Sequence, residues 1–375
     1  MYRLVQRRGI IGLFCLLFVA SSVVPGWAQK DNRFEVSKNL DIFNSLLKEV
    51  EMFYVDSVDV DKTVQRGIEA MLAGLDPYTE YYPEQKTEEL SLMTTGEYGG
   101  IGSLIRQRNN EGGVMIAEPT EGMPADLAGL KPGDLILAID TIDVSKATNS
   151  RVSELLKGVP NTKMVLTIQR PGEKKPRKFE ITRKQITTPQ VTYYGVKNDS
   201  IGYIYLKAFT IKSAQEVKEA FLDLKKNHNI KSLVLDLRGN GGGVLEGAVQ
   251  IVGMFVPKGS EVLSTKGKIK QWDRTYRTST EPLDTVMPLA ILINGGTASA
   301  AEIVSGSLQD MDRAVLVGQR SFGKGLVQAP RDLPYNGKVK ITMSKYYIPS
   351  GRCIQQIDYS HRKEDGRHFR LLHLK

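Results

Sequence analysis

The second half of the chain alternates between short apolar runs and longer amphipathic stretches, and this pattern most constrains the fold. The runs SLVLDL (232–237) and PLAILI (288–293) have almost no polar alternation. Strands of this kind are buried on both faces, which is typical of parallel sheets covered by helices. The stretches between the runs, such as 213–227, repeat apolar residues at helical spacing. From Ile186 onward the sequence therefore predicts an α/β core with a mainly parallel sheet.

The first 28 residues have the composition of a targeting segment. Three arginines and no acidic residue precede an apolar run from Ile10 to Val24. That run has 15 residues, and a bilayer span needs about 20. Small residues then lead to Ala28, where a signal peptidase would cut. We expect a cleaved signal peptide over 1–28 and an exported or periplasmic protein; the alternative is an uncleaved membrane anchor.

Changes in hydrophobic periodicity and turn composition divide the rest of the chain into three segments. Residues 29–95 form an N-terminal region whose apolar periodicity is helical from 31 to about 89. Residues 96–185 contain short alternating runs separated by Pro-Gly turns, which indicates a β-rich domain with one helix near 150–158. Residues 186–375 form the core described above and end in a short basic tail.

Bulk composition excludes several classes of function. The net charge of +9 includes the three signal arginines, so the remaining basic bias is too mild for a nucleic-acid surface. Cys353 is the only cysteine after the predicted signal peptide, so we expect no internal disulfide. No cluster of histidine, cysteine and acidic residues has metal-ligand spacing. We therefore expect neither a metal nor a cofactor.

Ser299 follows the apolar strand 288–294 in a stretch of very small residues, GGTASAA. It stands at the predicted start of a helix, where backbone N–H groups are unpaired and can stabilise an oxyanion. Small neighbours leave room for a substrate. Ser299 is therefore a candidate nucleophile, and an ordinary helix N-cap is the alternative.

No histidine is placed to serve this serine as a base. Of four histidines, three lie in the last 15 residues, and His228 stands in a polar turn. Lysine can act instead when burial lowers its pKa. The candidate is Lys324, which stands between Gly323 and Gly325 after a predicted strand. The alternative is a solvated surface lysine.

The loop LDLRGNGGG (235–243) follows another apolar strand. It does not match a dinucleotide fingerprint, because the sixth position from Gly239 is Val244, and no Lys-Ser/Thr pair follows for a nucleotide loop. Exposed N–H groups serving an oxyanion hole fit the loop better. Asp236 and Arg238 are predicted to form an ion pair that holds it.

Several motifs in a fixed order resemble one family, the carboxy-terminal processing proteases. These motifs are GTASAAEI, GKGLVQ, LDLRGNGGG and LDPYTEYY. Tyr78 stands where the family has histidine, and the chain ends sooner than many members do. The resemblance implies a crotonase/ClpP-like core in which Ser299 attacks and Lys324 is the general base. It also implies that Gln328 orients the lysine, and that the N–H groups of Gly239 and Ala300 form the oxyanion hole.

The β-rich insert resembles a PDZ domain. PADLAGLKPGDLILAIDTIDV is its most recognisable stretch, and YGGIGSLI is similar to a carboxylate-binding loop centred on Gly100, Ile101 and Gly102. Consecutive loop N–H groups can bind a terminal carboxylate while the peptide adds as a strand.

The combined prediction is an exported serine endopeptidase that binds unfolded or C-terminally apolar polypeptides and cuts them with a Ser–Lys dyad. It would need no cofactor, and a homo-oligomer or an adaptor partner stays open. One alternative is a catalytically inactive PDZ-type peptide-binding protein. The other is a crotonase-like acyl-transfer enzyme, which would bind coenzyme A.

Overall fold

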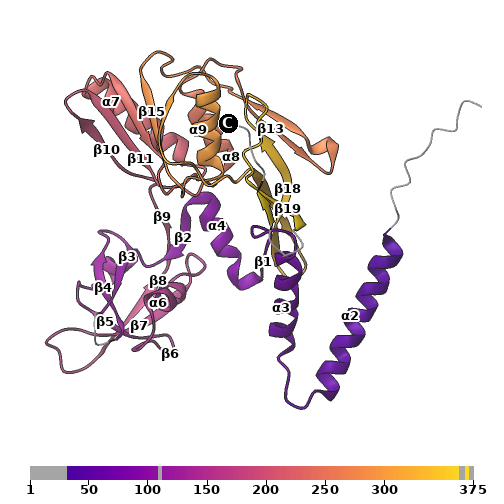
Figure 1. Cartoon of the computed structure of the whole chain (residues 1–375). Helices are drawn as coiled ribbons and strands as arrows, with labels where there is room; N and C mark the ends of the chain where they lie inside the picture. Colours follow the sequence, from indigo (N-terminus) through magenta and orange to yellow (C-terminus); the bar gives the residue numbers. More distant parts are fainter. Residues whose placement is uncertain (1–31, 109–111, 363–367, 371–375) are drawn as a thin grey trace, which may run out of the picture. The chain divides into compact units, whose positions relative to one another are not determined.

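A five-stranded sheet carries the larger hydrophobic core of the protein (Figure 1). Its order is β10 (Val191–Lys197), β11 (Ile201–Leu206), β12 (Ser232–Asp236), β15 (Leu289–Ile293) and β16 (Val315–Gly318). The last four strands pair in parallel, whereas β10 pairs antiparallel with β11. The apolar runs predicted as strands are therefore strands, and their carboxyl ends meet at one edge.

Helices join the parallel strands, as the helical periodicity predicts. They are α7 (Ser213–Asn227), α8 (Leu245–Gly253) and α9 (Ala300–Asp310). α7 contacts β10 and β11, while α8 and α9 pack against each other (Figure 1). α9 is buried from Ala300 to Leu308, which explains why its sequence has small residues at almost every turn.

A second sheet is antiparallel, and the sequence analysis did not predict it. It contains β1 (Glu80–Tyr82), β13 (Glu261–Gly267), β14 (Arg274–Arg277), β17 (Leu326–Asp332) and β18 (Lys338–Tyr347). β1 contradicts the expectation of helix up to residue 89. It pairs with β18, more than 250 residues later, and buries Tyr82 there. Local periodicity cannot reveal a partner so distant in sequence.

The PDZ-like insert has its own sheet and its own core. The sheet order is β3 (Ser103–Gln107), β4 (Val114–Pro119), β5 (Leu135–Ile139), β7 (Lys163–Gln169) and β8 (Arg177–Thr182), with β6 (Ile142–Asp143) beside β5. α6 (Asn149–Leu156) is the predicted helix. A second short helix, α5 (Pro124–Leu127), was not expected. The apolar residues between these elements form a separate cluster.

Two paired strands connect the insert to the rest of the chain. β2 (Glu97–Gly100) enters the insert and β9 (Lys184–Thr187) leaves it, with Gly100 opposite Lys184. α4 (Thr87–Thr95) precedes β2. The strands β19 (Ile357–Arg362) and β20 (His368–Arg370) pair near the end of the chain.

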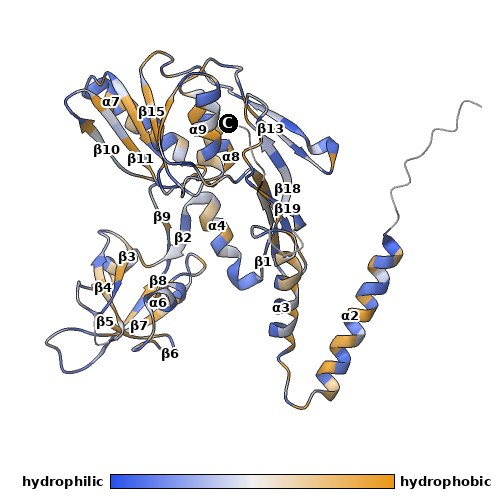
Figure 2. Cartoon of the chain, viewed as in Figure 1, coloured by the Kyte–Doolittle hydropathy of each residue, from blue (hydrophilic) through white to orange (hydrophobic). Residues whose placement is uncertain are grey.

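The computed structural model describes residues 32–108, 112–362 and 368–370. The predicted signal peptide and its cleavage site therefore lie outside the described residues. The chain divides into two units, 1–68 and 69–375. In the first, α2 (Arg33–Phe53) buries no residue and alternates polar and apolar side chains (Figure 2); α3 (Val60–Ala73) begins there. Within the described ranges, no helix is both long and apolar enough to span a bilayer.

Candidate active site

The loops that follow β12 and β15 are tied together at the carboxyl edge of the parallel sheet. The hydroxyl of Thr297 donates to the carbonyl oxygen of Leu237 at 2.8 Å and accepts from the N–H of Asn294 at 2.9 Å. The buried Asn240 accepts the N–H of Ala298 on its own carbonyl at 2.9 Å. The two glycine-rich motifs therefore meet in one place, where open parallel sheets commonly bind ligands.

Ser299 stands in a strained turn at the start of α9. Its backbone has φ 55° and ψ −117°, a conformation that few residues other than glycine adopt. The side chain is half-buried. A non-glycine residue held in such a conformation is common at functional sites, because the surrounding structure must enforce it. Ser299 is also the N-cap residue of α9, as one of the two interpretations of the sequence predicts.

The glycine-rich loop lies directly against this turn. A Cβ atom on Gly242 would stand 2.7 Å from the carbonyl oxygen of Ala298, 2.7 Å from Ser299 Cβ and 2.9 Å from the nitrogen of Ala300. Gly242 also has φ 93°. Only glycine therefore fits here, which explains why the motif has no side chain at this position.

Lys324 reaches the same region from the segment before β17. Its side chain is half-buried, and burial lowers the pKa of its amine; repulsion from Lys340 acts in the same direction. The carboxylates of Glu80, Asp76 and Glu302 oppose the shift. A lysine with a lowered pKa can be neutral and can accept a proton.

Glu302 joins the two candidate catalytic residues through their backbones. Its Oε2 atom accepts the N–H of Ser299 at 2.9 Å and the N–H of Lys324 at 2.8 Å. Its Oε1 atom accepts the N–H of Gly323 and the hydroxyl of Ser321, both at 2.7 Å. The residue is 1% exposed. One carboxylate with four donors therefore fixes the backbones of Ser299 and Lys324 relative to each other.

Tyr346 adds a second link between the two backbones. Its hydroxyl donates to the carbonyl oxygen of Lys324 at 2.8 Å and lies 3.3 Å from that of Ser299. The residue is fully buried in β18. The antiparallel sheet thus supports the site on the parallel one.

The side chains of Ser299 and Lys324 are not joined. Across the described part of the chain, no hydrogen bond links Ser299 Oγ to Lys324 Nζ. The amine lies over the ring of Tyr78 instead, 4.3 Å from its centroid.

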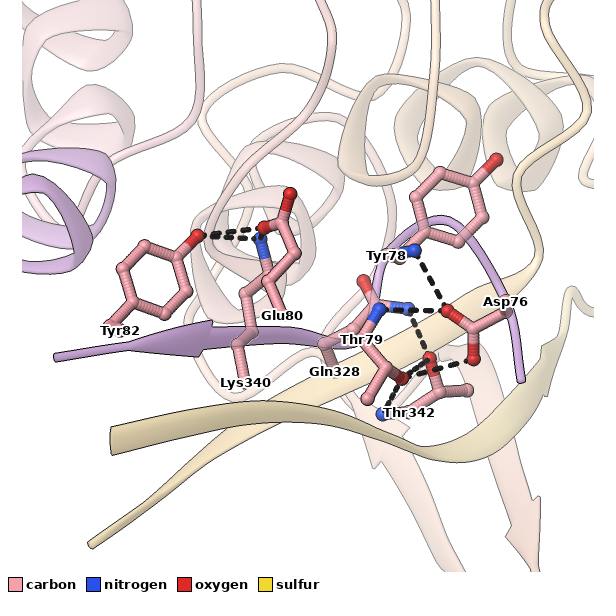
Figure 3. Close-up of polar contacts among 8 residues, drawn as sticks. All are labelled: Asp76, Tyr78, Thr79, Glu80, Tyr82, Gln328, Lys340 and Thr342. Carbon is pink, nitrogen blue, oxygen red and sulfur yellow. Dashed lines mark hydrogen bonds and ion pairs between the residues drawn. The ribbon is translucent and has the colours of Figure 1, made fainter. Parts of the chain in front are cut away.

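Gln328 and Gly239 make other contacts than those the resemblance implies. The side-chain nitrogen of Gln328 donates to Thr342 Oγ1 at 3.0 Å, as Figure 3 shows. The N–H of Gly239 donates to Asn294 Oδ1 at 2.9 Å. The N–H of Ala300, by contrast, has no hydrogen-bond partner among the residues that the structure describes, and so it is open to an oxyanion.

The ion pair predicted beside the loop is confirmed. Arg238 Nη2 lies 2.6 Å from Asp236 Oδ2, and Asp236 also accepts the hydroxyl of Tyr203. Asp236 is buried at the end of β12, so this pairing satisfies its charge.

The loop of Gly100, Ile101 and Gly102 in the insert also has backbone N–H groups that are not used within the described structure. The carbonyl oxygens of Ile101 and Gly102 accept the N–H groups of Ala125 and Thr120, at 2.8 and 2.9 Å. Gly102 has φ 66°, and Gly100 ends β2. The N–H groups of Ile101 and Gly102 make no hydrogen bond to a described residue. The loop then leads into β3, which contacts α6.

No group of three or more histidine, cysteine or acidic residues in the described ranges could hold a metal ion.

Comparisons with known proteins identify the family of the chain. Residues 200–360 match peptidase family S41, and residues 115–170 match the PDZ domain family. A carboxy-terminal-processing protease of Bartonella bacilliformis is 36% identical over 345 residues, 91% of this chain and 77% of that protein. The chain belongs to peptidase family S41, with the carboxy-terminal-processing proteases. The resemblance seen in the motifs is therefore confirmed, as is the serine-peptidase class.

Two further proteins are similar over most of this chain. A probable CtpA-like serine protease of Staphylococcus aureus is 33% identical over 320 residues, which cover 84% of this chain but only 62% of that protein. A solved photosystem II D1 C-terminal processing protease aligns with a TM-score of 0.47 and 29% identity, over 84% of this chain and 89% of its own.

Three site residues were missed from the sequence: Glu302, Tyr78 as a neighbour of the lysine, and Tyr346. Glu302 had a readable signal, because a glutamate three positions after a helix-starting serine forms a capping box. Tyr78 lies in the motif LDPYTEYY, but that motif does not indicate its contact with the lysine. Tyr346 reaches the site from the antiparallel sheet, so no local pattern indicates it.

Proposed function

We propose that the protein is an exported serine endopeptidase that uses Ser299 as nucleophile and Lys324 as general base. The observation that carries this proposal is the shared carboxylate of Glu302, which holds the strained serine and the half-buried lysine by their backbones. A nucleophile and a base need such fixed geometry, since a displacement of about 1 Å can cost a hundredfold in rate.

The chemistry follows from these groups. Neutral Lys324 accepts the proton of Ser299 Oγ as that oxygen bonds to the scissile carbonyl carbon. The N–H of Ala300 stabilises the oxyanion, joined by the N–H of Gly239 once Asn294 turns away. The lysine returns the proton to the leaving amine, and the C–N bond breaks. Water then adds to the acyl carbon and gives a proton to Lys324, and Lys324 passes that proton to Ser299 Oγ as the bond between this oxygen and the acyl carbon breaks.

A cleavage assay on an unfolded protein tests the proposal. Ser299→Ala and Lys324→Ala should each lower kcat by at least about a thousandfold, because each removes a group that the acylation step requires. Thermal unfolding should show that both variants remain folded. Full turnover in Ser299→Ala would refute the assignment.

The lowered pKa of Lys324 predicts the pH dependence. Only the neutral amine accepts a proton, so kcat/KM should rise with pH through the pKa of Lys324, which burial places below 10.5. A profile without such a rise, measured on the free enzyme, would exclude lysine as the base.

The PDZ domain supports the proposed substrate class. A peptide would add along β3 beside α6, with its terminal carboxylate on the loop of Gly100, Ile101 and Gly102. Substrates with apolar C-termini or unfolded segments fit this mode, and 1–28 as a cleaved signal peptide would place the protein outside the cytoplasm. Binding of a peptide acid, compared with its amide by calorimetry, tests the carboxylate contact.

A catalytically inactive peptide-binding protein is the second candidate. It is favoured by one observation, the amine that rests on Tyr78 without a hydrogen bond to Ser299. Under that alternative, wild type binds peptides through its PDZ domain and cleaves none of them.

A further inference from the structure

The amine of Lys324 lies on the face of the ring of Tyr78, the residue that stands where the family has histidine. Its Nζ atom is 4.3 Å from the centroid of Tyr78. This distance is within the range of a cation–π interaction, in which the negative face of the ring attracts an ammonium. The ring covers part of the amine of a half-buried side chain, and burial lowers the pKa of that amine.

Tyr78 is held in place from both ends. At its backbone, Asp76 Oδ1 accepts the N–H groups of Tyr78 and Thr79, both at 2.8 Å (Figure 3). At its ring, the hydroxyl lies 3.4 Å from that of Tyr359, and the two rings meet edge to face. Asp76 and Thr79 are buried, so the turn that presents the ring is packed into the protein.

The charges around the amine come from β18, β1, the turn before β1, and α9. Lys340 on β18 repels the ammonium and is itself paired with Glu80 on β1. The turn contributes Asp76, and α9 contributes Glu302. Burial raises the pKa of Tyr78, so its hydroxyl stays neutral while the lysine titrates.

We propose that Tyr78 is a positioning residue for Lys324: its ring holds the ammonium away from Ser299 at rest, and the amine moves to the serine once it has lost its proton. The inference rests on the proposed function. Tyr78 would set the resting position of the Lys324 amine and the pH at which this amine becomes neutral.

The ring has two effects on the amine that oppose each other. Its bulk excludes water, which favours the neutral amine. Its quadrupole attracts the ammonium, which favours the charged form. A side chain that keeps the bulk and loses the quadrupole should therefore lower the pKa of Lys324. A small side chain that loses both and admits water should raise that pKa.

Three substitutions separate these effects. Tyr78→Phe keeps the ring and should leave the pKa of Lys324 unchanged. Tyr78→Leu keeps an apolar cover without a quadrupole and should lower the pKa by roughly 0.5 to 1. Tyr78→Ala admits water and should raise it. The pH at which kcat/KM rises should be unchanged in Tyr78→Phe, lower in Tyr78→Leu and higher in Tyr78→Ala.

A direct readout does not depend on catalysis. In the Ser299→Ala background, the rate of acetylation of Lys324 by acetic anhydride is followed from about pH 6 to 11 by mass spectrometry, since only the neutral amine reacts. The midpoint reports the pKa however accessible the amine is. The exposed Lys226 in the same digest is the control.

The proposal stands if the midpoint falls in Tyr78→Leu and holds in Tyr78→Phe. It is overturned if Leu leaves the midpoint unchanged, if Leu and Ala move it in the same direction, or if Phe moves it as far as Leu. Should Tyr78→Ala fail to fold, the comparison of Leu with Phe still decides. Because labelling needs no turnover, an inactive wild type would refute the proposed function while leaving this result readable.

Discussion

At the scale of single residues, one buried carboxylate connects the backbones of Ser299 and Lys324. Glu302 accepts four hydrogen bonds and is 1% exposed, so each of its donors would be unsatisfied without it. Because two of the donors are the N–H groups of Ser299 and Lys324, the strained turn and the proposed base share one support. The nucleophile motif and the lysine motif are therefore parts of one structure.

Glu302→Gln tests this support. The amide presents N–H where the carboxylate accepts, so two of the four donors lose their acceptor, at about 1–3 kcal/mol of unfolding free energy. We expect kcat to fall at least tenfold with little change in KM. Chemical denaturation and steady-state kinetics measure the two effects. Glu281→Gln, at an exposed glutamate, is the control. Equal changes of stability and kcat in both variants would contradict a supporting role of Glu302.

The half-buried Lys324 should lower the stability of the folded protein at neutral pH. In the unfolded chain Lys324 has a pKa near 10.5, and in the folded protein burial lowers that pKa. Between the folded and the unfolded pKa, the unfolded chain therefore binds a proton that the folded protein lacks, and the free energy of unfolding rises with pH. Below the folded pKa, the folded protein carries the ammonium at a desolvation cost.

Lys324→Met removes that cost. The free energy of unfolding should rise by about 0.5–2 kcal/mol at neutral pH, and the gain should disappear as the pH approaches 10.5. Urea denaturation at several pH values measures both. If the increase in the free energy of unfolding were independent of pH, it would come from better packing of methionine and not from removal of a desolvated ammonium.

At the scale of elements, the glycine-rich loop and the start of α9 depend on close approach of backbones. Gly242 lies against the turn of Ser299, whereas a Cβ atom added to Gly241, one residue earlier, would meet no other atom within 4 Å. The loop motif therefore contains glycines with different structural demands.

Gly242→Ala should disturb the turn and Gly241→Ala should not. The added carbon at 242 contacts the backbone of α9 at 2.7 to 2.9 Å, and φ 93° adds strain. We expect a loss of roughly 1–3 kcal/mol and of most activity. The Gly241 variant should keep its melting temperature and kcat. Similar losses in both would show that the loop is required for another reason.

At the scale of the whole molecule, the PDZ domain is an insertion with an independent core. Its apolar cluster is separate from that of the catalytic sheets, and β2 and β9 place its two ends on neighbouring strands. Neighbouring strands lie about 5 Å apart, so a short linker can replace the domain without moving either strand.

Replacing residues 101–183 with a short Gly-Ser linker should leave the catalytic unit folded. Cleavage of a peptide whose C-terminus fits the PDZ domain should lose affinity, with KM raised roughly tenfold or more, because the tethered binding step is absent. A peptide with an amidated C-terminus is the control and should be cleaved equally by both proteins. Loss of folding on replacement would contradict the independence of the two cores.

Several expectations from the sequence agree with the structure for local reasons. The apolar runs at 232–237 and 288–293 are central strands, and 213–227 is helix α7, because periodicity and burial act within a few residues. The order of the motifs was sufficient to identify the family. The same reasoning failed at Glu80–Tyr82, where a pairing with β18 overrides the local pattern.

The amino-acid sequence by itself determined the class of the fold in the second half, the family, and the two residues proposed to do the chemistry. Only the tertiary structure decided what surrounds the lysine: the ring of Tyr78, the shared carboxylate of Glu302 and the support of Tyr346. The reason is physical. Strands and helices arise from interactions between near neighbours, whereas the pKa of an amine depends on every group that folding brings to it.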